Sequence, residues 1–524
     1  MKRFMVAAAV AAGLAVPVRA QTPQYPGLVV LIAVDQMRGD YLDRFATQWT
    51  GGFKRFRDTG TFFPHGRQDH ASTETAPGHS TMLSGREPGH TGIILNNRGV
   101  QDPTSPALGV PDPQGSSPRR FQGTTLYDWL LARDPQTRVL SVSRKDRGAI
   151  FPVGRGRGNV YWWLGGRFTT SRYYTDTLPK WVSEFDSHID LAHIAGSTWN
   201  LLLPESAYQE PDSMAFENAG SDFTFPHQLP GNDVIANRIT SYPVMDSLTL
   251  AFAITGVEKM RLGTRGSPDL LVVSLSTTDA VGHAYGPDSR EIHDQLLHVD
   301  RWLGQFFDSL SKLVPGGMVA ALTGDHGIVS LPEYAVLVKH QHAGRVGMGS
   351  FPKDVEQELE ERYHVPFDLS FDNGLLSADV DALRARGVNV DSLSAALAKR
   401  IAANPGISQV FTPATLPQAP DTGAAPLWRR LLPDGYGWLA VAAMRPGYVW
   451  SSGSLGGEHG GMNAEDIEVP IAFFGAGVPV RRVDRPARTV DIGPTLAAIL
   501  GVKPTEKLDG EILPEVVGSS SASR

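Results

Sequence analysis

Five short runs of apolar residues constrain the fold of this chain more than any other sequence feature. They lie at 28–34 (LVVLIAV), 138–143 (RVLSVS), 270–276 (LLVVSLS), 318–323 (MVAALT) and 468–475 (EVPIAFFG). Such runs, without regular polar alternation, are typical of strands buried on both faces of a parallel sheet. Residues 289–310 and 490–500 carry helical patterns. Strands that alternate with helices predict an α/β sandwich with a mostly parallel central sheet.

Two stretches interrupt this alternation and predict insertions. Residues 151–266 are irregular and aromatic, as at 161–163 (YWW) and 173–174 (YY), and we expect them to form a cap. Those rings could stack on a nucleotide base or an aryl group, or they could be packed core, which we favour slightly. Residues 346–436 hold a helical pattern at 390–404 and a Pro/Gly-rich connection at 413–433, so we expect a second, smaller insertion. The core then comprises 27–150, 267–345 and 437–515, and 516–524 form a disordered tail.

The first 20 residues predict export of the chain. Lys2 and Arg3 precede a run of about 13 apolar residues that ends near Ala20, which is the pattern of a signal peptide. A membrane anchor would need about 20 apolar residues, and no later stretch reaches that length. We therefore expect a periplasmic or secreted protein without stable membrane insertion, and a monomer.

The net charge argues against nucleic-acid polymers as partners. Loss of residues 1–20 would remove Lys2, Arg3 and Arg19 and lower the formal charge from −7 to −10. An acidic protein is a poor general binder of nucleic acid. An anionic substrate would have to meet positive charge that a metal or a few basic residues concentrate locally.

The chain contains no cysteine, and this excludes whole classes of chemistry. A thiol nucleophile, a cysteine-bound zinc, an iron–sulfur cluster and a disulfide are all ruled out. Any metal must therefore be bound by nitrogen and oxygen. The 15 histidines and 55 acidic residues are the available ligands.

Polar side chains gather where the predicted strands end, or in loops. Three aspartates and three histidines are placed in this way: Asp35, Asp279, His283, Asp325, His326 and His459. In open α/β sheets, function collects at the carboxyl ends of the strands. Mixed Asp/His ligands without sulfur suit zinc, and suit manganese or iron less well.

Two similar pairs are not expected to be functional. Asp294 and His298 lie inside a predicted helix, and we interpret them as a solvated helix face. Asp69 and His70 lie in a polar loop, which we interpret as ordinary surface.

Thr75 precedes Pro77 and a predicted helix, and two interpretations stay open. It could simply be an N-cap. Alternatively, the free N–H groups and dipole of a helix N-terminus could stabilise an alkoxide or a phosphoryl group. A hydroxyl in that position needs only a nearby metal to become a nucleophile.

The motifs resemble those of the alkaline phosphatase superfamily. Within it, the chain looks like the bacterial phosphate-irrepressible alkaline phosphatases and the type I phosphodiesterase/nucleotide pyrophosphatase group. The resemblance runs from about residue 28 to 515 and is carried by 34–41 (VDQMRGDY), Thr75 with Gly78-His79, Asn96, 276–283 (STTDAVGH), Asp325-His326-Gly327 and His459-Gly460. It implies an alkaline-phosphatase-like three-layer sandwich.

The resemblance also implies two zinc ions per chain and a nucleophile. One zinc would be bound by Asp279, His283 and His459, and the other by Asp35, Thr75, Asp325 and His326. Zinc pairs of this kind clamp the attacking and leaving oxygens of an in-line displacement. The hydroxyl of Thr75 would attack phosphorus and give a phosphothreonine, which is then hydrolysed.

Lys145 and Arg147 separate the two branches of the family that the resemblance allows. A Lys-x-Arg pair at this place contacts the phosphoryl oxygens in the monoesterase branch, and the diesterase branch lacks it. A monoester dianion has one more anionic oxygen to compensate than a diester, and the two cations supply that charge. Asn96 would donate a hydrogen bond to the phosphoryl group. The alternative interpretation is that Lys145 and Arg147 belong to a basic surface loop and have no part in the site.

We therefore expect a secreted, zinc-dependent hydrolase of small-molecule phosphate monoesters, with a phosphodiesterase/nucleotide pyrophosphatase as the alternative. Enterobacterial relatives use serine and a magnesium site, whereas this chain has Thr75, so we predict no magnesium dependence. A sulfatase would need a cysteine or serine for conversion to formylglycine. A non-catalytic metal- or phosphate-binding protein would not need the nucleophile. No Gly-x-Ser-x-Gly elbow or Walker A motif is present in the sequence.

Overall fold

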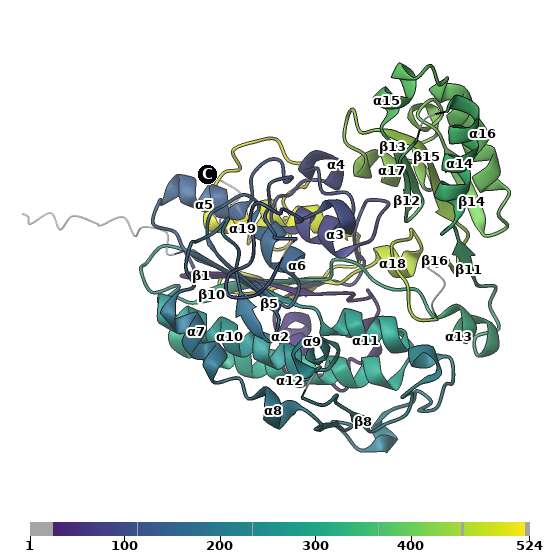
Figure 1. Cartoon of the computed structure of the whole chain (residues 1–524). Coiled ribbons are helices and arrows are strands. Elements are labelled where there is room, and N and C mark those ends of the chain that lie inside the picture. The colour runs from purple at the N-terminus through teal and green to yellow at the C-terminus, as the bar shows by residue number, and fades with distance from the viewer. Residues whose placement is uncertain (1–24, 113, 233, 365, 452–454, 519–524) are drawn as a thin grey trace, which may run out of the picture.

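A computed structural model describes residues 25–112, 114–232, 234–364, 366–451 and 455–518 (Figure 1). The predicted signal peptide and residues 519–524 of the predicted tail lie outside the described residues. The first part of that tail is described, and Val516 is fully buried in the core. Among the described residues, no helix has the length and apolar character that crossing a bilayer requires.

The predicted α/β fold is confirmed. In the described part of the chain, nine strands form one mixed sheet in the order β18-β2-β17-β10-β1-β9-β4-β5-β6. In chain order, the strands are β1 (Leu28–Val34), β2 (Thr61–Phe63), β4 (Val139–Ser143), β5 (Asn159–Leu164), β6 (Arg167–Thr169), β9 (Asp269–Leu275), β10 (Met318–Thr323), β17 (Ile471–Gly475) and β18 (Arg481–Arg482). Strand β1 lies between β9 and β10 and pairs in parallel with both, whereas β17 is antiparallel to β10. Every apolar run that predicted a strand lies in this sheet.

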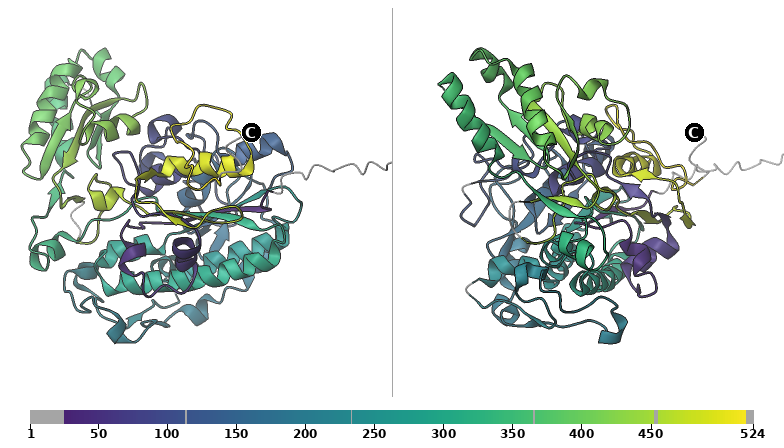
Figure 2. Two further views of the ribbon diagram at one scale, coloured as in Figure 1. Left: turned by 180° about the vertical axis from the view of Figure 1, so that it is seen from behind. Right: turned by 90° about the vertical axis from the view of Figure 1, so that its right-hand side faces the viewer.

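Helices cover both faces of the sheet, and the two views of Figure 2 show the same layers from behind and from the side. One layer contains α3 (Thr75–Met82), α5 (Leu126–Arg133), α6 (Asp146–Ile150) and α19 (Ile492–Leu500). The other contains α2 (Gly52–Thr59), α10 (Val244–Met260), α11 (Thr277–Tyr285) and α12 (Arg290–Leu313). Alternate residues of β1 enter opposite cores: Ile32 packs toward α12, and Leu31 packs toward α19. Because both faces are covered, the strand is apolar along its whole length.

The first insertion is smaller than expected. Strands β5 and β6 belong to the main sheet, and α10 packs against β4 and β9. The part outside the sandwich is therefore about residues 170–243, with α7 (Lys180–Ser187), α8 (Leu191–Ile194), β7 (Thr198–Trp199), β8 (His227–Gln228) and α9 (Ile235–Arg238). The rings of Tyr161, Trp162 and Trp163 are 2–5% exposed and pack in the cores on the two faces of the sheet. These aromatic residues are therefore packed core of the main sheet.

Asp294 anchors this insertion, so its interpretation as a solvated helix face is wrong. The side chain is fully buried. It accepts hydrogen bonds from Trp199 Nε1 at 2.7 Å, from the backbone N–H of Leu202 at 2.7 Å and from the Tyr208 hydroxyl at 2.5 Å. The insertion covers this face of α12, and the pattern of the helix alone does not show that.

His70 was also misjudged as ordinary surface. It is fully buried, and burial lowers its pKa to about 3. Its neighbour Asp69 is half-buried and pairs with Arg67 at 3.2 Å and with Arg430 at 3.1 Å. Arg430 belongs to the second insertion, so the loop is part of the contact between that insertion and the core.

The second insertion is a small α/β domain at one end of the sandwich (Figure 1). Its described strands form an antiparallel sheet in the order β12-β13-β15-β14, namely β12 (Leu369–Asp372), β13 (Leu375–Ala378), β15 (Trp438–Met444) and β14 (Ile407–Phe411). Helices α14 (Phe351–Tyr363), α15 (Val380–Ala385) and α16 (Val390–Ala402) pack on one face. The other face, with α17 (Ala425–Leu431), packs against core residues Ala71, Ile94 and Leu95.

The chain enters and leaves this domain through β11 (Gly344–Gly347) and β16 (Tyr448–Ser451), which pair in parallel. The domain therefore spans 344–451, and the boundary expected at 436 is too early. Residues 438–444 (WLAVAAM), which the expected boundary leaves in the core, form β15 of this domain.

Candidate active site

The carboxyl ends of the central strands bring the predicted site residues together. Asp35 directly follows β1, and Asp325 follows β10 by two residues. Asp279 lies in the first turn of α11 after β9, and Lys145 follows β4 by two residues. Thr75 opens α3, and all five side chains are buried. The structure therefore places residues that are up to 290 positions apart in one cluster below the N-terminus of α3.

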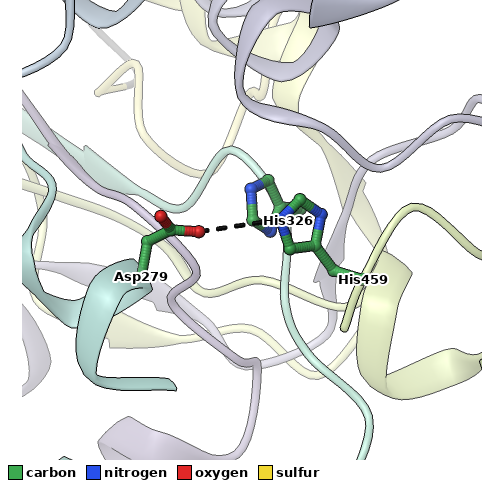
Figure 3. A group of neighbouring side chains, drawn as sticks. All are labelled: Asp279, His326 and His459. Carbon is green, nitrogen blue, oxygen red and sulfur yellow. Dashed lines mark ion pairs between the residues drawn. The ribbon is translucent and has the colours of Figure 1, made fainter. Parts of the chain in front are cut away.

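Two groups of three side chains could each hold a metal ion. Asp279, His326 and His459 form one group (Figure 3), and Asp35, Asp325 and His326 form the other. In each group the donor atoms lie within 4.8 Å of one another. His326 is common to both, and its ring stacks on that of His459 with centroids 3.8 Å apart.

His283 lies beside the first group without completing it. Its Nε2 is 3.3 Å from Asp279 Oδ1, and its ring centroid is 4.9 Å from that of His459. The resemblance implies that His283 binds a metal together with Asp279 and His459. It implies that His326 belongs only to the second ligand set. All three residues are neighbours in the structure, so both groupings use the same cluster.

The histidines are oriented as metal ligands. The Nδ1 atoms of His283, His326 and His459 lie 2.6, 2.9 and 2.7 Å from the carbonyl oxygens of Gly457, Gly327 and Thr73. A carbonyl oxygen can only accept, so each Nδ1 carries the proton and donates it. Each Nε2 therefore presents its lone pair to the cluster when the ring is neutral. This is the usual arrangement of metal-bound histidine.

Buried polar atoms in the cluster fit a bound cation. Asp35 Oδ1, Asp325 Oδ2 and His326 Nε2 are buried without a hydrogen-bond partner among the described residues. Burial of unpartnered polar atoms is costly, and a metal ion would satisfy all three. The donors are nitrogen and oxygen only, which suits zinc.

Burial and the neighbouring charges shift the pKa values of the side chains in the cluster. Burial alone would raise the pKa of Asp279, but Lys145 and His283 hold that pKa well below its usual range. Burial and the neighbouring Asp325 raise the pKa of Asp35. Burial lowers the pKa of His459, and the nearby His326 lowers it further, so His459 is neutral and able to bind metal.

Thr75 lies between a cation and a helix N-terminus. The ammonium of Lys145 donates a hydrogen bond of 3.1 Å to Thr75 Oγ1 and lies 2.7 Å from carboxylate oxygens of both Asp35 and Asp279. The N-cap of α3 is Glu74, so Thr75 is the first helical residue and is not a simple N-cap. Its hydroxyl is left available for chemistry.

Asn96 contacts the first turn of α3, and the charge of Arg147 acts on the residue before Thr75. Asn96 Oδ1 accepts a hydrogen bond of 2.8 Å from the N–H of Ala76, which leaves the amide NH2 as its donor. Arg147 is half-buried, 3.8 Å from Asp146, and its charge acts on the Glu74 carboxyl next to Thr75. Burial and Asp372 raise the pKa of Glu74 to about 8, and Arg147 opposes that rise.

Sequence reasoning assigned no role to two residues that orient this cluster. The backbone N–H of Gln36 donates to Asp325 Oδ1 at 3.0 Å, and its side chain donates to Asp279 Oδ1 at 3.1 Å. His79 Nδ1 lies 2.9 Å from the carbonyl oxygen of Thr75, and its Nε2 lies 2.9 Å from Ser274 Oγ, so the ring connects the start of α3 to β9. Both residues lie inside the quoted motifs, so their positions were a usable signal.

Two motif glycines allow close approach at the site. A Cβ atom on Gly78 would lie 2.1 Å from the carbonyl oxygen of Asp325, and a Cβ on Gly282 would lie 1.7 Å from Gln36 Oε1. Any side chain at Gly78 would push α3 away from the ligand strand. Gly78 therefore sets the distance between the Thr75 helix and Asp325, and Gly282 makes room for the Gln36 side chain against α11.

The fold and the site define an α/β enzyme with a candidate metal centre at the carboxyl edge of its sheet. Residues 29–405 match the family model described as type I phosphodiesterase / nucleotide pyrophosphatase, and the chain belongs to this family. It is 30% identical to alkaline phosphatase PafA of Elizabethkingia meningoseptica over 99% of both chains. It is also 30% identical to alkaline phosphatase PhoK of a Sphingomonas species, over 96% of this chain and 93% of the relative.

The crystal structure of wild-type PafA has the same fold. It superposes with a TM-score of 0.86 at 28% identity, over 94% of this chain and 99% of that chain. The predicted superfamily and the predicted alkaline-phosphatase-like sandwich are therefore confirmed.

Proposed function

We propose that this chain is a zinc-dependent alkaline phosphatase that hydrolyses small-molecule phosphate monoesters through a phosphothreonine at Thr75. The observation that carries the proposal is the position of Lys145. Its ammonium contacts the Thr75 hydroxyl and, at the same time, two carboxylates from different ligand groups. Nucleophile, cation and candidate ligands thus form one contiguous site.

The enzyme class predicted from the sequence, a phosphoric monoester hydrolase, is confirmed by its relatives. PafA and PhoK are named alkaline phosphatases, and each matches the chain over nearly its whole length. The finer statements about zinc, the phosphothreonine and the compartment are our proposals. We propose export to the periplasm or the exterior, and a monomer.

The donor set indicates which residues would hold two zinc ions. Asp35, Thr75, Asp325 and His326 would hold one, and Asp279, His283 and His459 would hold the other, with His326 close to both. Bound zinc would supply Lewis-acid charge for the attacking, leaving and phosphoryl oxygens. The residues of the chain hold these ligands in place through Gln36 and through the backbone carbonyls that fix each histidine.

The residues of the chain supply the nucleophile and the contacts to the phosphoryl group. Thr75 Oγ1 forms a bond to phosphorus while the bond to the alcohol oxygen breaks, and the alcohol leaves with a proton. Water then attacks phosphorus, the bond to Thr75 breaks, and phosphate is released. Lys145 stabilises negative charge on Oγ1, and Lys145, Arg147 and the NH2 of Asn96 compensate charge on the phosphoryl oxygens.

Phosphodiesterase activity is the second candidate, and the description of the family model favours it. Lys145 and Arg147 favour the monoesterase, because a diester has one anionic oxygen fewer to compensate. Rates on an aryl phosphate monoester and on the matching diester decide between the two. We expect the monoester to be the better substrate, and a faster diester would reverse the assignment.

The covalent step can be tested directly. The enzyme would be mixed with an aryl phosphate, quenched in acid and digested, and the peptide containing Thr75 would be analysed by mass spectrometry. We expect a phosphoryl group on Thr75 in the native enzyme and on no residue of that peptide in Thr75→Ala. Phosphate on another residue, or turnover by Thr75→Ala, would overturn the assignment.

A further inference from the structure

The hairpin between β12 and β13 extends from the small domain to the residue that precedes the nucleophile. At its tip, Asn373 (φ 45°) and Gly374 (φ 88°) adopt left-handed backbone conformations, which make the turn tight. Asn373 Nδ2 donates a hydrogen bond to Glu74 Oε1. The two residues are 299 positions apart, so this is a contact between the small domain and the catalytic core.

Glu74 links this contact to Asn96. Its second oxygen, Oε2, accepts a hydrogen bond of 2.7 Å from the backbone N–H of Asn96. The Glu74 side chain is buried, so these two donors satisfy a carboxyl group that water does not reach freely. Through this carboxyl group, the side chain of Asn373 is connected to the backbone of Asn96.

The chain of contacts ends beside Thr75. Asn96 Oδ1 is held at 2.8 Å by the N–H of Ala76, the residue after the nucleophile. This bond occupies the amide oxygen and leaves the NH2 of Asn96 as the group that would donate to the phosphoryl oxygens. A movement of the Asn96 backbone would therefore displace a donor to the substrate.

The small domain packs directly against the segment that leads to Asn96. Its α17 face packs against Ile94 and Leu95, which immediately precede Asn96. The hairpin tip also fits closely against the loop that carries His459: a Cβ on Gly460 would lie 2.6 Å from Asn373 Cγ.

We propose that Asn373 is a positioning residue, which orients Asn96 for phosphoryl binding through Glu74. This inference rests on the function proposed above. It implies that the small domain supplies a residue that helps to position a phosphoryl-binding side chain. Asn373 does not touch the phosphoryl group itself. Its effect passes through one carboxyl group and one backbone N–H.

The main test is Asn373→Gly, because glycine keeps the left-handed backbone and removes only the amide. We expect kcat/KM for an aryl phosphate monoester to fall about 10-fold, and inhibition by inorganic phosphate to weaken by a similar factor. Asn373→Asp, which sets a carboxylate against Glu74, should cost at least as much. Ser370→Ala is the matched control: it removes a hydrogen bond to Ser377 within the same hairpin and should leave both values unchanged.

A double-mutant cycle with Asn96→Ala shows whether Asn373 acts through Asn96. We expect Asn373→Gly to change kcat/KM less than 2-fold once Asn96 is alanine. A full 10-fold loss in that background, or no loss in the single variant, would overturn the positioning role. If Asn96→Ala alone left kcat/KM unchanged, the contact between Asn96 and the phosphoryl group that we propose as part of the function would be refuted. If Asn96→Ala lowered kcat/KM and Asn373→Gly did not, only the positioning proposal would fail.

Discussion

The ammonium group of Lys145 donates a hydrogen bond of 3.1 Å to the hydroxyl of Thr75. The two residues come from different layers of the structure, one from the end of β4 and the other from the start of α3. The resemblance implied that Lys145 contacts phosphoryl oxygens. In the structure, the same ammonium also lies 2.7 Å from carboxylate oxygens of Asp35 and Asp279, so it connects these candidate metal ligands to the hydroxyl that we propose as the nucleophile.

Replacement of Lys145 and Arg147 by alanine should separate monoester from diester hydrolysis. A charge-assisted hydrogen bond contributes about 1.5–3 kcal/mol, so each lost cation should lower kcat/KM for an aryl monoester by about 10- to 100-fold. The diester should lose much less, because it has one anionic oxygen fewer. Steady-state rates on the paired substrates measure this, and equal losses on both would remove the reason to prefer a monoesterase.

Thr75→Ala should abolish turnover while the fold is kept. Loss of a nucleophile that acts together with its neighbours typically costs on the order of 10³-fold or more. Thr75→Ser keeps the hydroxyl and should retain much of the activity. Circular dichroism and Tm check the fold of both variants, and wild-type turnover by Thr75→Ala would exclude this residue as the nucleophile.

Removal of metal should abolish hydrolysis and lower Tm, because Asp35 and Asp325 are buried carboxylates that a cation stabilises. Zinc should restore both activity and Tm. Magnesium should restore neither, since we predict no magnesium dependence. Dialysis against chelator, followed by activity and thermal melts with each metal, tests this. Full activity in excess chelator would contradict the metal assignment.

Asp294→Ala should destabilise the protein strongly. The substitution leaves the donors of Trp199, Leu202 and Tyr208 without their acceptor, and each buried unsatisfied group costs about 1–3 kcal/mol. We expect the free energy of unfolding in urea to fall by about 3 kcal/mol or more. The control is Asp308→Ala on the same helix as Asp294, which removes an exposed ion pair with Arg55 of α2 and should leave the free energy of unfolding nearly unchanged.

Glu217→Gln should stabilise the protein most at alkaline pH. Burial, together with the nearby Glu291, raises the pKa of Glu217 to about 9. Between the usual pKa of a glutamate and pH 9, the unfolded chain releases this proton while the folded protein keeps it. Stability therefore falls as pH rises through that window. Glutamine removes this dependence, so the gain in Tm over wild type should be larger at pH 9 than at pH 6.

The matched control for this measurement is Glu184→Gln, on the exposed side of α7. Its Tm difference from wild type should not grow with pH. A gain for Glu217→Gln that was the same at pH 6 and pH 9 would contradict the raised pKa.

The strands and the candidate ligands could be predicted from the sequence because both leave local signals. The run at 28–34 is apolar throughout, since both of its faces are covered, and Asp35 is the first polar residue after it. Family motifs then added roles for Thr75, Asn96 and Lys145. The structure brings these residues to one edge of the sheet.

What the sequence did not reveal depends on contacts between distant segments. Asp294 is buried because the first insertion covers this part of α12. The sequence pattern of a helix does not indicate which other segment packs on its polar face. The end of the small domain was misplaced because β15 is as apolar as a core strand. The contact between Asn373 and Glu74 joins a hairpin tip to a helix cap, and neither residue belongs to a recognisable motif.

The parallel pairing of β11 with β16 bears on how this chain could be re-engineered. Gly344 lies opposite Tyr448 and Gly347 lies opposite Ser451, so the chain leaves β11 and re-enters β16 at opposite ends of the pair, about 10 Å apart at roughly 3.3 Å per residue. A foreign domain whose termini are separated by that distance could be grafted between these strands without lengthening any connection of the core. The graft would still have to bring its own donor for Glu74, since the strands preserve the junction and the hairpin supplies Asn373.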